Sequence, residues 1–412
     1  MTPKPTKLQL DYYKEGLACF MHFGMNTFTD VEWGDGKASL DSFQLVDFDY
    51  DDYVKTIKEL GFKRLIVTAK HHDGFCLWHS KQTNYHIGNT SYQKDFLKEL
   101  SKACSQYNMN MGIYLSPWDA HEPSYGSGQA YNEFYLNQIE EICQNPDYGN
   151  QGKFIEWWFD GAKDPNFVDQ DYDFDAWMAM VRKYNPDILM FGVGSYGGIH
   201  WSGNEEGEVL DPNLNRLPKH ILEIDYDKMK DPLQGHHSGY VWSVPEADTP
   251  TTSGWFWHSD ESIKSKEKLI DIYFKSIGRG GVLLLNIAPN TDGNIPSELK
   301  RRLFEVKNEL SQLFATNLLE GMEATVSLDN KTTSYSINLA DPVEAQVLSL
   351  HEEIEKGQKI IDCQVYFDDQ LMTEFKSIGY KRLYRFEKRP IKDINIICES
   401  IDQVALKDIK LY

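Results

Sequence analysis

The sequence predicts an α/β protein in which a (β/α) TIM-like barrel is followed by a C-terminal antiparallel β-sandwich. Short apolar runs alternate with segments of helical period over the first three quarters of the chain. From about residue 318, apolar and polar residues alternate, which is typical of short antiparallel strands. We therefore expect the barrel over residues 1–316 and the β-sandwich over residues 317–412.

Six apolar runs are the expected barrel strands, because buried parallel strands are short, apolar and mostly rich in β-branched or aromatic residues. They span residues 18–24, 64–70, 111–117, 154–160, 188–194 and 281–289. An open doubly wound sheet is the competing architecture, but no glycine-rich phosphate-binding fingerprint follows an early run. The segment 195–260 has little regular pattern, and we expect long loops there.

Helices are expected between and after these runs. Apolar stripes at helical spacing begin at Tyr53, Phe96, Trp177 and Leu299. Gly61 is placed to cap the end of the first helix, and Asn185-Pro186 ends the third. In the C-terminal region, the expected strands include residues 324–328, 336–339, 346–350, 363–367 and 395–398.

The net charge of −21 disfavours nucleic acid and anionic membrane surfaces as partners, because both attract basic proteins. A neutral ligand carries no such penalty. The six cysteines are scattered without a CxxC pair, which matches neither a disulfide framework nor a zinc site. No apolar run has the length of a membrane span and no signal peptide is visible. The expected location is cytoplasmic, or periplasmic or secreted if a leader has been removed.

Polar and aromatic residues follow the expected strands, and in a barrel the carboxyl ends of the strands meet at one rim. The first run ends in His22-Phe23-Gly24, the second continues into His71-His72-Asp73, and the third contains Tyr114. The fourth run ends in Trp157-Trp158-Phe159-Asp160. An isolated Asp of this kind often only caps a turn. Beside Trp158 and facing histidines, Asp160 is instead a candidate catalytic carboxylate.

The histidine pair has three interpretations. The two rings are buried core residues with hydrogen-bond partners, or hydrogen-bonding groups for a neutral ligand, or part of a metal site for which Asp73, His22 and His79 are also available. Adjacent residues on a strand point to opposite faces, so only one histidine of the pair joins a ligand set without local distortion. This argues against the metal site. The loop from Trp201 to Glu208 offers three further acids, Glu205, Glu206 and Glu208, unless it is simply a solvated acidic loop.

Several blocks together resemble the α-L-fucosidases of glycoside hydrolase family 29. They are His22-Phe-Gly24, Glu32-Trp33, Lys70-His-His-Asp-Gly-Phe75, Ser116-Pro-Trp-Asp119, Trp158-Phe-Asp-Gly161 and Arg279-Gly-Gly281 with Leu283-Leu-Leu-Asn286. They occur in the family's order over residues 16–316. The resemblance implies the barrel and β-sandwich predicted above, an α-L-fucosidase activity, a fucosylated oligosaccharide as substrate, and no metal or organic cofactor.

The resemblance also implies residue roles. Asp160 matches the nucleophile, and the matches to fucose-contacting positions are His22, Glu32, Trp33, His71, His72, Tyr114 and Trp158. Trp255 and Trp257 resemble an aromatic pair that lines the pocket. The segment 203–207 resembles the branch that acts on α-1,3/1,4-linked fucose in branched, Lewis-type glycans, in which its first Glu, here Glu205, is the acid/base. The segment 244–250 carries more acidic residues than the family pattern leads us to expect.

The implied reaction is a double displacement with retention of configuration, in which Asp160 and Glu205 form the carboxyl pair. The choice between Glu205 and Glu206 stays open at this point. A fucosidase of broad acceptor range is the alternative within the same class. A metal-dependent hydrolase using His71, His72 and Asp73, and a sugar-binding protein without catalysis, are the alternatives outside it. The oligomeric state is not indicated by the sequence.

Overall fold

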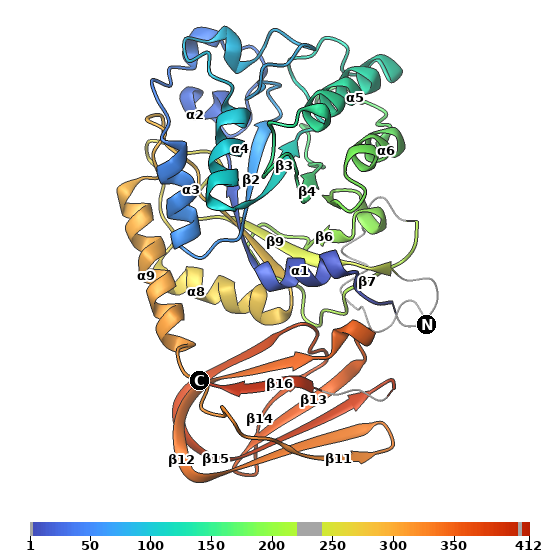
Figure 1. Ribbon diagram of the computed structural model, residues 1–412, viewed down its shortest axis with the longest axis vertical. Coiled ribbons are helices and arrows are strands. Elements are labelled where there is room, and N and C mark those ends of the chain that lie inside the picture. Colours follow the sequence, from blue (N-terminus) through green and yellow to red (C-terminus); the bar gives the residue numbers. More distant parts are fainter. Residues whose placement is uncertain (1–2, 221–240, 403–405) are drawn as a thin grey trace.

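Eight parallel strands form the central sheet of the N-terminal part of the chain, shown in the computed structural model in Figure 1. The structure describes residues 3–220, 241–402 and 406–412. The strands are β1 (Leu17–Met21), β2 (Arg64–Lys70), β3 (Asn110–Leu115), β4 (Glu156–Trp158), β5 (Leu189–Phe191), β6 (Ile199–Trp201), β9 (Val244–Pro250) and β10 (Val282–Asn286). Their order in the sheet is β5-β4-β3-β2-β1-β10-β9-β6.

The two edge strands, β5 and β6, meet and close the sheet into a barrel. A parallel bridge joins Met190 to Gly198, and the N–H of Met190 donates to the carbonyl of Gly197 at 2.9 Å. A Cβ atom on Gly197 would lie 1.7 Å from the Met190 carbonyl oxygen, so only glycine allows this approach. The predicted barrel is thereby confirmed.

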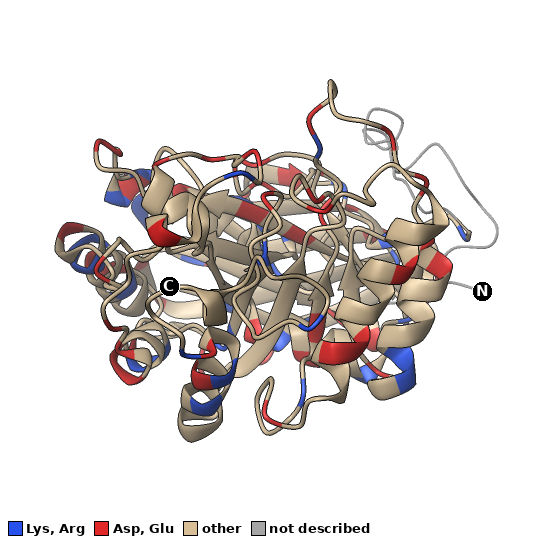
Figure 2. Ribbon diagram, turned by 90° about the horizontal axis from the view of Figure 1, so that it is seen from above, with Lys and Arg blue, Asp and Glu red and all other residues tan. Residues whose placement is uncertain are grey.

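Helices cover the outside of the barrel (Figure 1). They are α3 (Tyr50–Glu59), α4 (Phe96–Tyr107), α5 (Gln129–Gln144), α6 (Phe174–Tyr184), α8 (Lys266–Lys275) and α9 (Ser297–Leu313). The four predicted helices correspond to α3, α4, α6 and α9. Figure 2 shows acidic and basic residues interspersed over these outer helices and the loops beside them.

The interior of the barrel is packed by side chains that alternate along the strands. Phe20 on β1, Ile66 on β2, Tyr114 on β3 and Trp158 on β4 belong to one buried cluster. The intervening strand residues instead pack against the outer helices in a larger cluster. The helix α1 (Lys7–Glu15) precedes β1, and its Tyr12 belongs to the inner cluster. A short helix, α2 (Met25–Thr29), follows β1.

The prediction of long loops over residues 195–260 is wrong for β6 and β9, which are barrel strands. The sequence of β9 contains two prolines and two acids, residue types that are depleted in strands. The strand forms because its buried carboxyl groups find partners inside the barrel: Trp158 Nε1 donates to Glu246 at 2.8 Å and Trp201 Nε1 donates to Asp248 at 2.7 Å. A further pair in this region, β7 (Arg216–Leu217) and β8 (Val241–Trp242), is antiparallel.

The C-terminal region is an antiparallel sheet that bends around its own core. Its strands are β11 (Thr325–Asp329), β12 (Thr332–Glu352), β13 (Ile360–Phe367), β14 (Gln370–Phe375), β15 (Arg382–Ser400) and β16 (Leu406–Leu411). The long strands β12 and β15 shift register between Asn338 and Val343, and Figure 1 shows both strongly curved. The predicted β-sandwich is confirmed, although residues 336–339 and 346–350 lie in the single strand β12.

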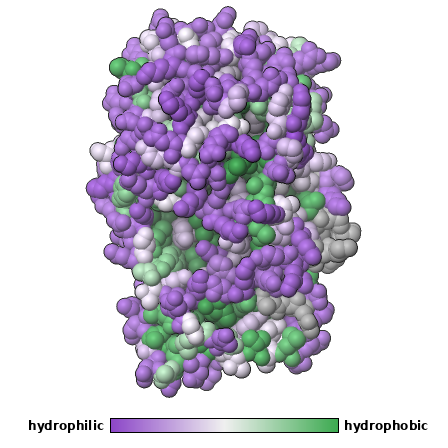
Figure 3. All heavy atoms as spheres, viewed as in Figure 1, coloured by the Kyte–Doolittle hydropathy of each residue, from purple (hydrophilic) through white to green (hydrophobic). Residues whose placement is uncertain are grey.

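The two parts of the chain are joined through α9, which ends at Leu313, and β11 begins at Thr325. The predicted boundary at residues 316 and 317 falls between these two elements. On the face shown in Figure 3, apolar surface gathers where the barrel meets the sandwich and on the sandwich itself. Across the junction, Arg382 forms two 2.7 Å bonds with the carboxylate of Asp211. No helix of the described segments combines the length and apolar character that crossing a bilayer requires.

Candidate active site

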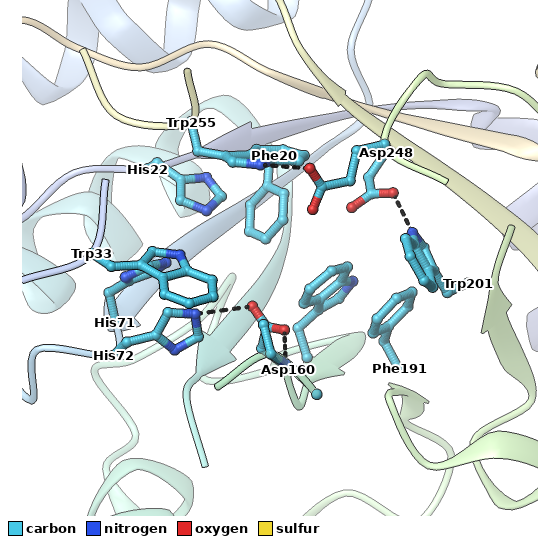
Figure 4. Close-up of a pocket in the computed structure, with 14 residues that line it drawn as sticks. Phe20, His22, Trp33, His71, His72, Asp160, Phe191, Trp201, Asp248 and Trp255 are labelled. Carbon is cyan, nitrogen blue, oxygen red and sulfur yellow. Dashed lines mark hydrogen bonds and ion pairs between the residues drawn. The ribbon is translucent and has the colours of Figure 1, made fainter. Parts of the chain in front are cut away.

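A cavity of about 390 Å³ opens at the carboxyl ends of the barrel strands (Figure 4). Its walls come from segments at or just after the ends of β1, β2, β4, β5, β6 and β9. The lining residues are Phe20, His22, Trp33, His71, His72, Trp158, Asp160, Gly161, Ala162, Phe191, Trp201, Glu205, Asp248 and Trp255. Eight of the ten predicted site residues are therefore brought together in one cavity.

Asp160 lies two residues beyond the end of β4, and two hydrogen bonds fix its carboxyl group. Tyr114 donates to Oδ2 at 2.8 Å, the N–H of Ala162 donates to Oδ1 at 2.8 Å, and His72 Nε2 lies 3.7 Å from Oδ2. Burial raises the pKa of Asp160, while the bonds from Ala162 and Tyr114 favour the ionised form and oppose the rise. The residue thus caps a turn through one oxygen and presents the other near the cavity.

His22 and His72 each donate a ring proton away from the cavity. His22 Nδ1 lies 2.9 Å from Asn286 Oδ1, and His72 Nδ1 lies 2.7 Å from the hydroxyl of Ser116. Because that hydroxyl donates to the carbonyl of Trp118, it accepts from His72. Burial lowers the pKa of His22 and of His72 to about 3, so both rings are neutral at ordinary pH. The partners assign the proton to Nδ1 and leave Nε2 as an acceptor in both rings.

In His71 the hydrogen-bonding roles of the two ring nitrogens are reversed. The Asn26 amide, which also donates to the carbonyl of Glu32, lies 3.5 Å from His71 Nδ1. Nδ1 is therefore the acceptor, and Nε2 carries the proton. Burial lowers the pKa of His71 well below its usual range. The cavity thus offers two imidazole acceptors and one imidazole donor, a set suited to hydroxyl groups.

Both members of the histidine pair line the cavity, so the strand alternation that argued against a shared ligand set does not apply to them. The alternation of side chains applies within a strand, and β2 ends at Lys70, immediately before the pair. Lys70 and Asp119 form a buried ion pair at 2.9 Å that joins the segments carrying His72 and Trp118. Within the described residues, no group of three or more His, Cys, Asp or Glu side chains is arranged to hold a metal ion.

Of the three acids in the loop after β6, one faces the cavity. Glu205 lines it, and Oε2 accepts from Trp255 Nε1 at 3.3 Å. Glu206 and Glu208 instead form ion pairs of 3.7 and 2.9 Å with lysines of α8. The loop therefore separates Glu205 from its two neighbours.

The electrostatic surroundings keep Glu205 in its protonated form to a higher pH than usual. Burial is the main cause of its raised pKa, and the negative charges of Asp160 and Glu32 add to it. The hydrogen bond from Trp255 opposes this rise. A raised pKa is the property that a general acid needs.

Two predicted residues, Glu32 and Tyr114, do not line the cavity. Tyr114 lies behind Asp160, to which it donates. Glu32 accepts from the backbone N–H groups of Trp255 and Phe256 at 3.0 and 3.3 Å, so it supports the wall from outside. Trp257 likewise does not line the cavity.

Six lining residues were not among the predicted site residues, and of these Asp248 carries the most chemistry. Its side chain accepts from Trp201 Nε1 at 2.7 Å, and the residue is only 4% exposed. Burial raises the pKa of Asp248 well above its usual range, and the charge of Glu205 adds to the effect. The other five are Phe20, Gly161, Ala162, Phe191 and Trp201. Glu246 and Asp248 are two residues apart, so on a strand both side chains point to the same face. This spacing was the one signal in the sequence that a strand here directs acids into the barrel.

Trp158 forms part of the cavity wall and is anchored from inside the barrel. Its ring stacks on Phe191 with centroids 3.6 Å apart, and Nε1 donates to Glu246. Tyr12 bonds both Glu246 and Glu156. Burial and the adjacent charge of Glu246 raise the pKa of Glu156 well above its usual range. This buried network gives the indole a defined orientation.

The chain is similar to known α-L-fucosidases over most of its length. The family model described as Alpha-L-fucosidase matches residues 11–312. Alpha-L-fucosidase 1 of Arabidopsis thaliana is 33% identical over 95% of this chain and 84% of its own length. A putative alpha-L-fucosidase 1 of Oryza sativa is 34% identical over 97% of this chain and 82% of its own.

Solved structures show the same likeness. A Ruminococcus gnavus fucosidase of glycoside hydrolase family 29, in complex with fucose, is 37% identical and superimposes with a TM-score of 0.90. The superposition covers 100% of this chain and 96% of that one. A putative α-L-fucosidase of Bacteroides ovatus is 33% identical over 99% of this chain and 74% of its own, with a TM-score of 0.88.

Proposed function

This chain belongs to the α-L-fucosidases of glycoside hydrolase family 29, and we propose that Asp160 and Glu205 perform its retaining hydrolysis of terminal α-L-fucosides. The observation that supports these roles is the arrangement of the cavity. One carboxyl group is fixed by two hydrogen bonds, and a second has a raised pKa. Figure 4 shows Asp160 on the side of the cavity away from Trp255, whose indole bonds Glu205.

In the first step, an oxygen of Asp160 attacks C1 of fucose and the bond from C1 to the glycosidic oxygen breaks. Glu205 gives its proton to that oxygen, so the acceptor leaves as an alcohol. In the second step, Glu205 takes a proton from water, whose oxygen attacks C1 and releases Asp160 as a carboxylate. Two inversions at C1 give net retention.

The charge of Asp160 links the two roles of Glu205. While Asp160 is ionised, its charge helps to raise the pKa of Glu205, which favours the acid. Ester formation removes that charge, so the pKa of Glu205 falls and the carboxylate becomes available as a base. The imidazole acceptors of His22 and His72 and the donor of His71 would meanwhile hold sugar hydroxyls.

His71→Ala is expected to raise KM and lower kcat together, with kcat/KM falling by about two orders of magnitude, because contacts to sugar hydroxyls strengthen in the transition state. Steady-state kinetics with an aryl fucoside measure this. His351→Ala, on strand β12 of the sandwich, is the matched control and should leave both constants unchanged.

Exhaustive chelation of the wild type should also leave turnover unchanged. Activity that is lost on chelation and restored by zinc would contradict substrate binding by the histidines. It would favour the metal-dependent hydrolase instead.

We further propose that the natural substrates are branched glycans with α-1,3- or α-1,4-linked fucose. The support is the resemblance of the segment 203–207 together with the aromatic rim of the cavity. Trp33 is 48% exposed at this rim, and Trp201 and Trp255 also line the cavity. Exposed indole faces suit the apolar faces of acceptor sugars that lie beside fucose.

The linkage proposal predicts the relative rates on three substrates. A branched trisaccharide with α-1,3- or α-1,4-linked fucose should be hydrolysed with kcat/KM about 10² higher than a linear α-1,2-fucosylated disaccharide, because only the branched acceptor reaches the rim. An aryl fucoside reports the chemical step alone. Equal values for the two glycans would show a broad acceptor range, and no turnover of any of the three would indicate a sugar-binding protein without catalysis.

A further inference from the structure

Two loops that frame the cavity are tied together by His258. Its Nδ1 lies 2.7 Å from Asp30 Oδ1, and its Nε2 lies 2.5 Å from Glu32 Oε1. Asp30 and Glu32 belong to the loop after α2, which also carries Trp33, whereas His258 belongs to the loop after β9, which carries Trp255. Each loop therefore contributes one tryptophan to the cavity. The contacts of His258 with Asp30 and Glu32, called the tie below, connect the two loops.

The chemistry of the tie depends on the charge of the ring. A neutral imidazole has one N–H, so it donates to only one of two carboxylates, while an imidazolium donates to both. The third acid near the ring is Glu261, whose backbone N–H donates to the His258 carbonyl at 3.4 Å. Burial lowers the pKa of His258, but the bonds and charges of Glu32 and Asp30 outweigh it, and the pKa lies above its usual value.

Glu32 connects His258 to the wall of the cavity. Its carboxylate also accepts from the backbone N–H groups of Trp255 and Phe256. A Cβ atom on Gly254 would lie 2.2 Å from Glu32 Oε1 and 3.0 Å from the His258 ring, so the contact requires glycine at that position. The fit of the loop against Glu32 is therefore close.

The two residues held by Glu32 contact groups that the reaction uses. Trp255 Nε1 donates to Glu205 at 3.3 Å. The ring of Phe256 packs edge-on against His22 and His71, with centroids 5.4 and 4.9 Å apart. Movement of this loop would thus shift both the acid/base and two of the imidazoles.

We propose that protonated His258 is a positioning residue, which ties the Trp255 loop to the Asp30–Trp33 loop and so holds Trp255 against Glu205. The inference rests on the proposed role of Glu205. As the pH rises through the pKa of His258, one of its two bonds is lost and the wall of the cavity loosens. Substrate binding then weakens while the fold is kept.

The test is the pH dependence of KM and kcat for an activated aryl fucoside, whose leaving group needs little protonation, with wild type, His258→Gln and His79→Gln. In the wild type, KM should rise as the pH passes through the pKa of His258. His258→Gln should have a KM about 10-fold to 100-fold higher at low pH, with this rise absent, because its neutral amide does not titrate. His79 is exposed and does not line the cavity, so its variant should follow the wild type.

A second variant keeps the test decisive if His258→Gln folds poorly. Asp30 is half exposed, and Asp30→Asn removes one charge that raises the pKa of His258. The rise in KM should therefore move to lower pH in Asp30→Asn. A KM profile that is identical in wild type, His258→Gln and Asp30→Asn would overturn the proposal. Failure of the proposed function is a separate result, since it would show as wild-type-like hydrolysis by Glu205 variants.

Discussion

Replacement of Asp160 by asparagine is expected to lower kcat/KM for every fucoside by a factor on the order of 10⁴ to 10⁶, because the covalent intermediate can no longer form. The amide keeps the size of the side chain, and its oxygen can still accept from Tyr114 or Ala162. The variant should therefore fold and bind L-fucose nearly as the wild type does. Steady-state kinetics, thermal unfolding and calorimetric titration with fucose measure the three properties.

Asp169→Asn is the matched control for this variant. Asp169 lies in the same segment after β4, but its side chain is 96% exposed and it does not line the cavity. Wild-type turnover is expected. If Asp160→Asn kept a tenth of the activity, Asp160 would not be the nucleophile. A loss of fucose binding in parallel with turnover would indicate that Asp160 acts mainly in binding.

Glu205→Ala is expected to have its largest effect on substrates with poor leaving groups. Hydrolysis of a natural glycan should fall by about 10² to 10⁴, because the departing alkoxide is no longer protonated. For an activated aryl fucoside, the first step should be nearly unaffected and the second step slow. Azide, which needs no general base, should then accelerate turnover and give a fucosyl azide with retained configuration.

Glu206→Ala separates the two adjacent acids. Glu206 pairs with Lys268 at 3.7 Å on the outer side of the loop, so its removal should leave both substrate classes unaffected. If Glu206→Ala shows the azide-rescued pattern instead, the acid/base is Glu206. If neither variant shows it, the next carboxyl group in the cavity is Asp248, and the linkage preference loses the support of the segment 203–207 as well.

The pH profile of kcat/KM should follow the two carboxyl groups. Asp160 must be ionised, so activity is lost as the pH falls through its raised pKa. Glu205 must be protonated, so activity on natural glycans is lost as the pH rises through its own raised pKa. In Glu205→Ala, the alkaline decrease should be absent from the first step with an activated fucoside.

The barrel and most of the cavity followed from the sequence, because apolar runs and the residues at their ends are local features. Parallel strands bring their carboxyl ends to one rim, so His22, His71 and Asp160 converge once the strands are identified. The strand β9 was missed since its sequence, rich in proline and acids, has no apolar signal. Its carboxyl groups are stabilised by Trp158 and Trp201, partners that lie far away in the sequence.

Other features of the site depend on three-dimensional contacts that no local pattern records. Glu205 and Glu206 are adjacent residues of the same type, and they differ only in the direction in which the loop points their side chains. The proton positions on His22 and His71 are set by Asn286 at the end of β10 and by Asn26 in α2. The tie through His258 joins residues more than 200 positions apart and was not visible in the sequence.

Covalent trapping of the nucleophile tests the role of Asp160 most directly. An activated fluoro-fucoside forms the fucosyl-enzyme faster than water removes it, so the intermediate accumulates. Mass spectrometry of the intact wild type should show the addition of one fluorofucosyl group, and peptide mapping should place it on Asp160. The Asp160→Asn variant should remain unlabelled. A label on any other residue, or hydrolysis with inversion and no label at all, would contradict the double displacement through Asp160.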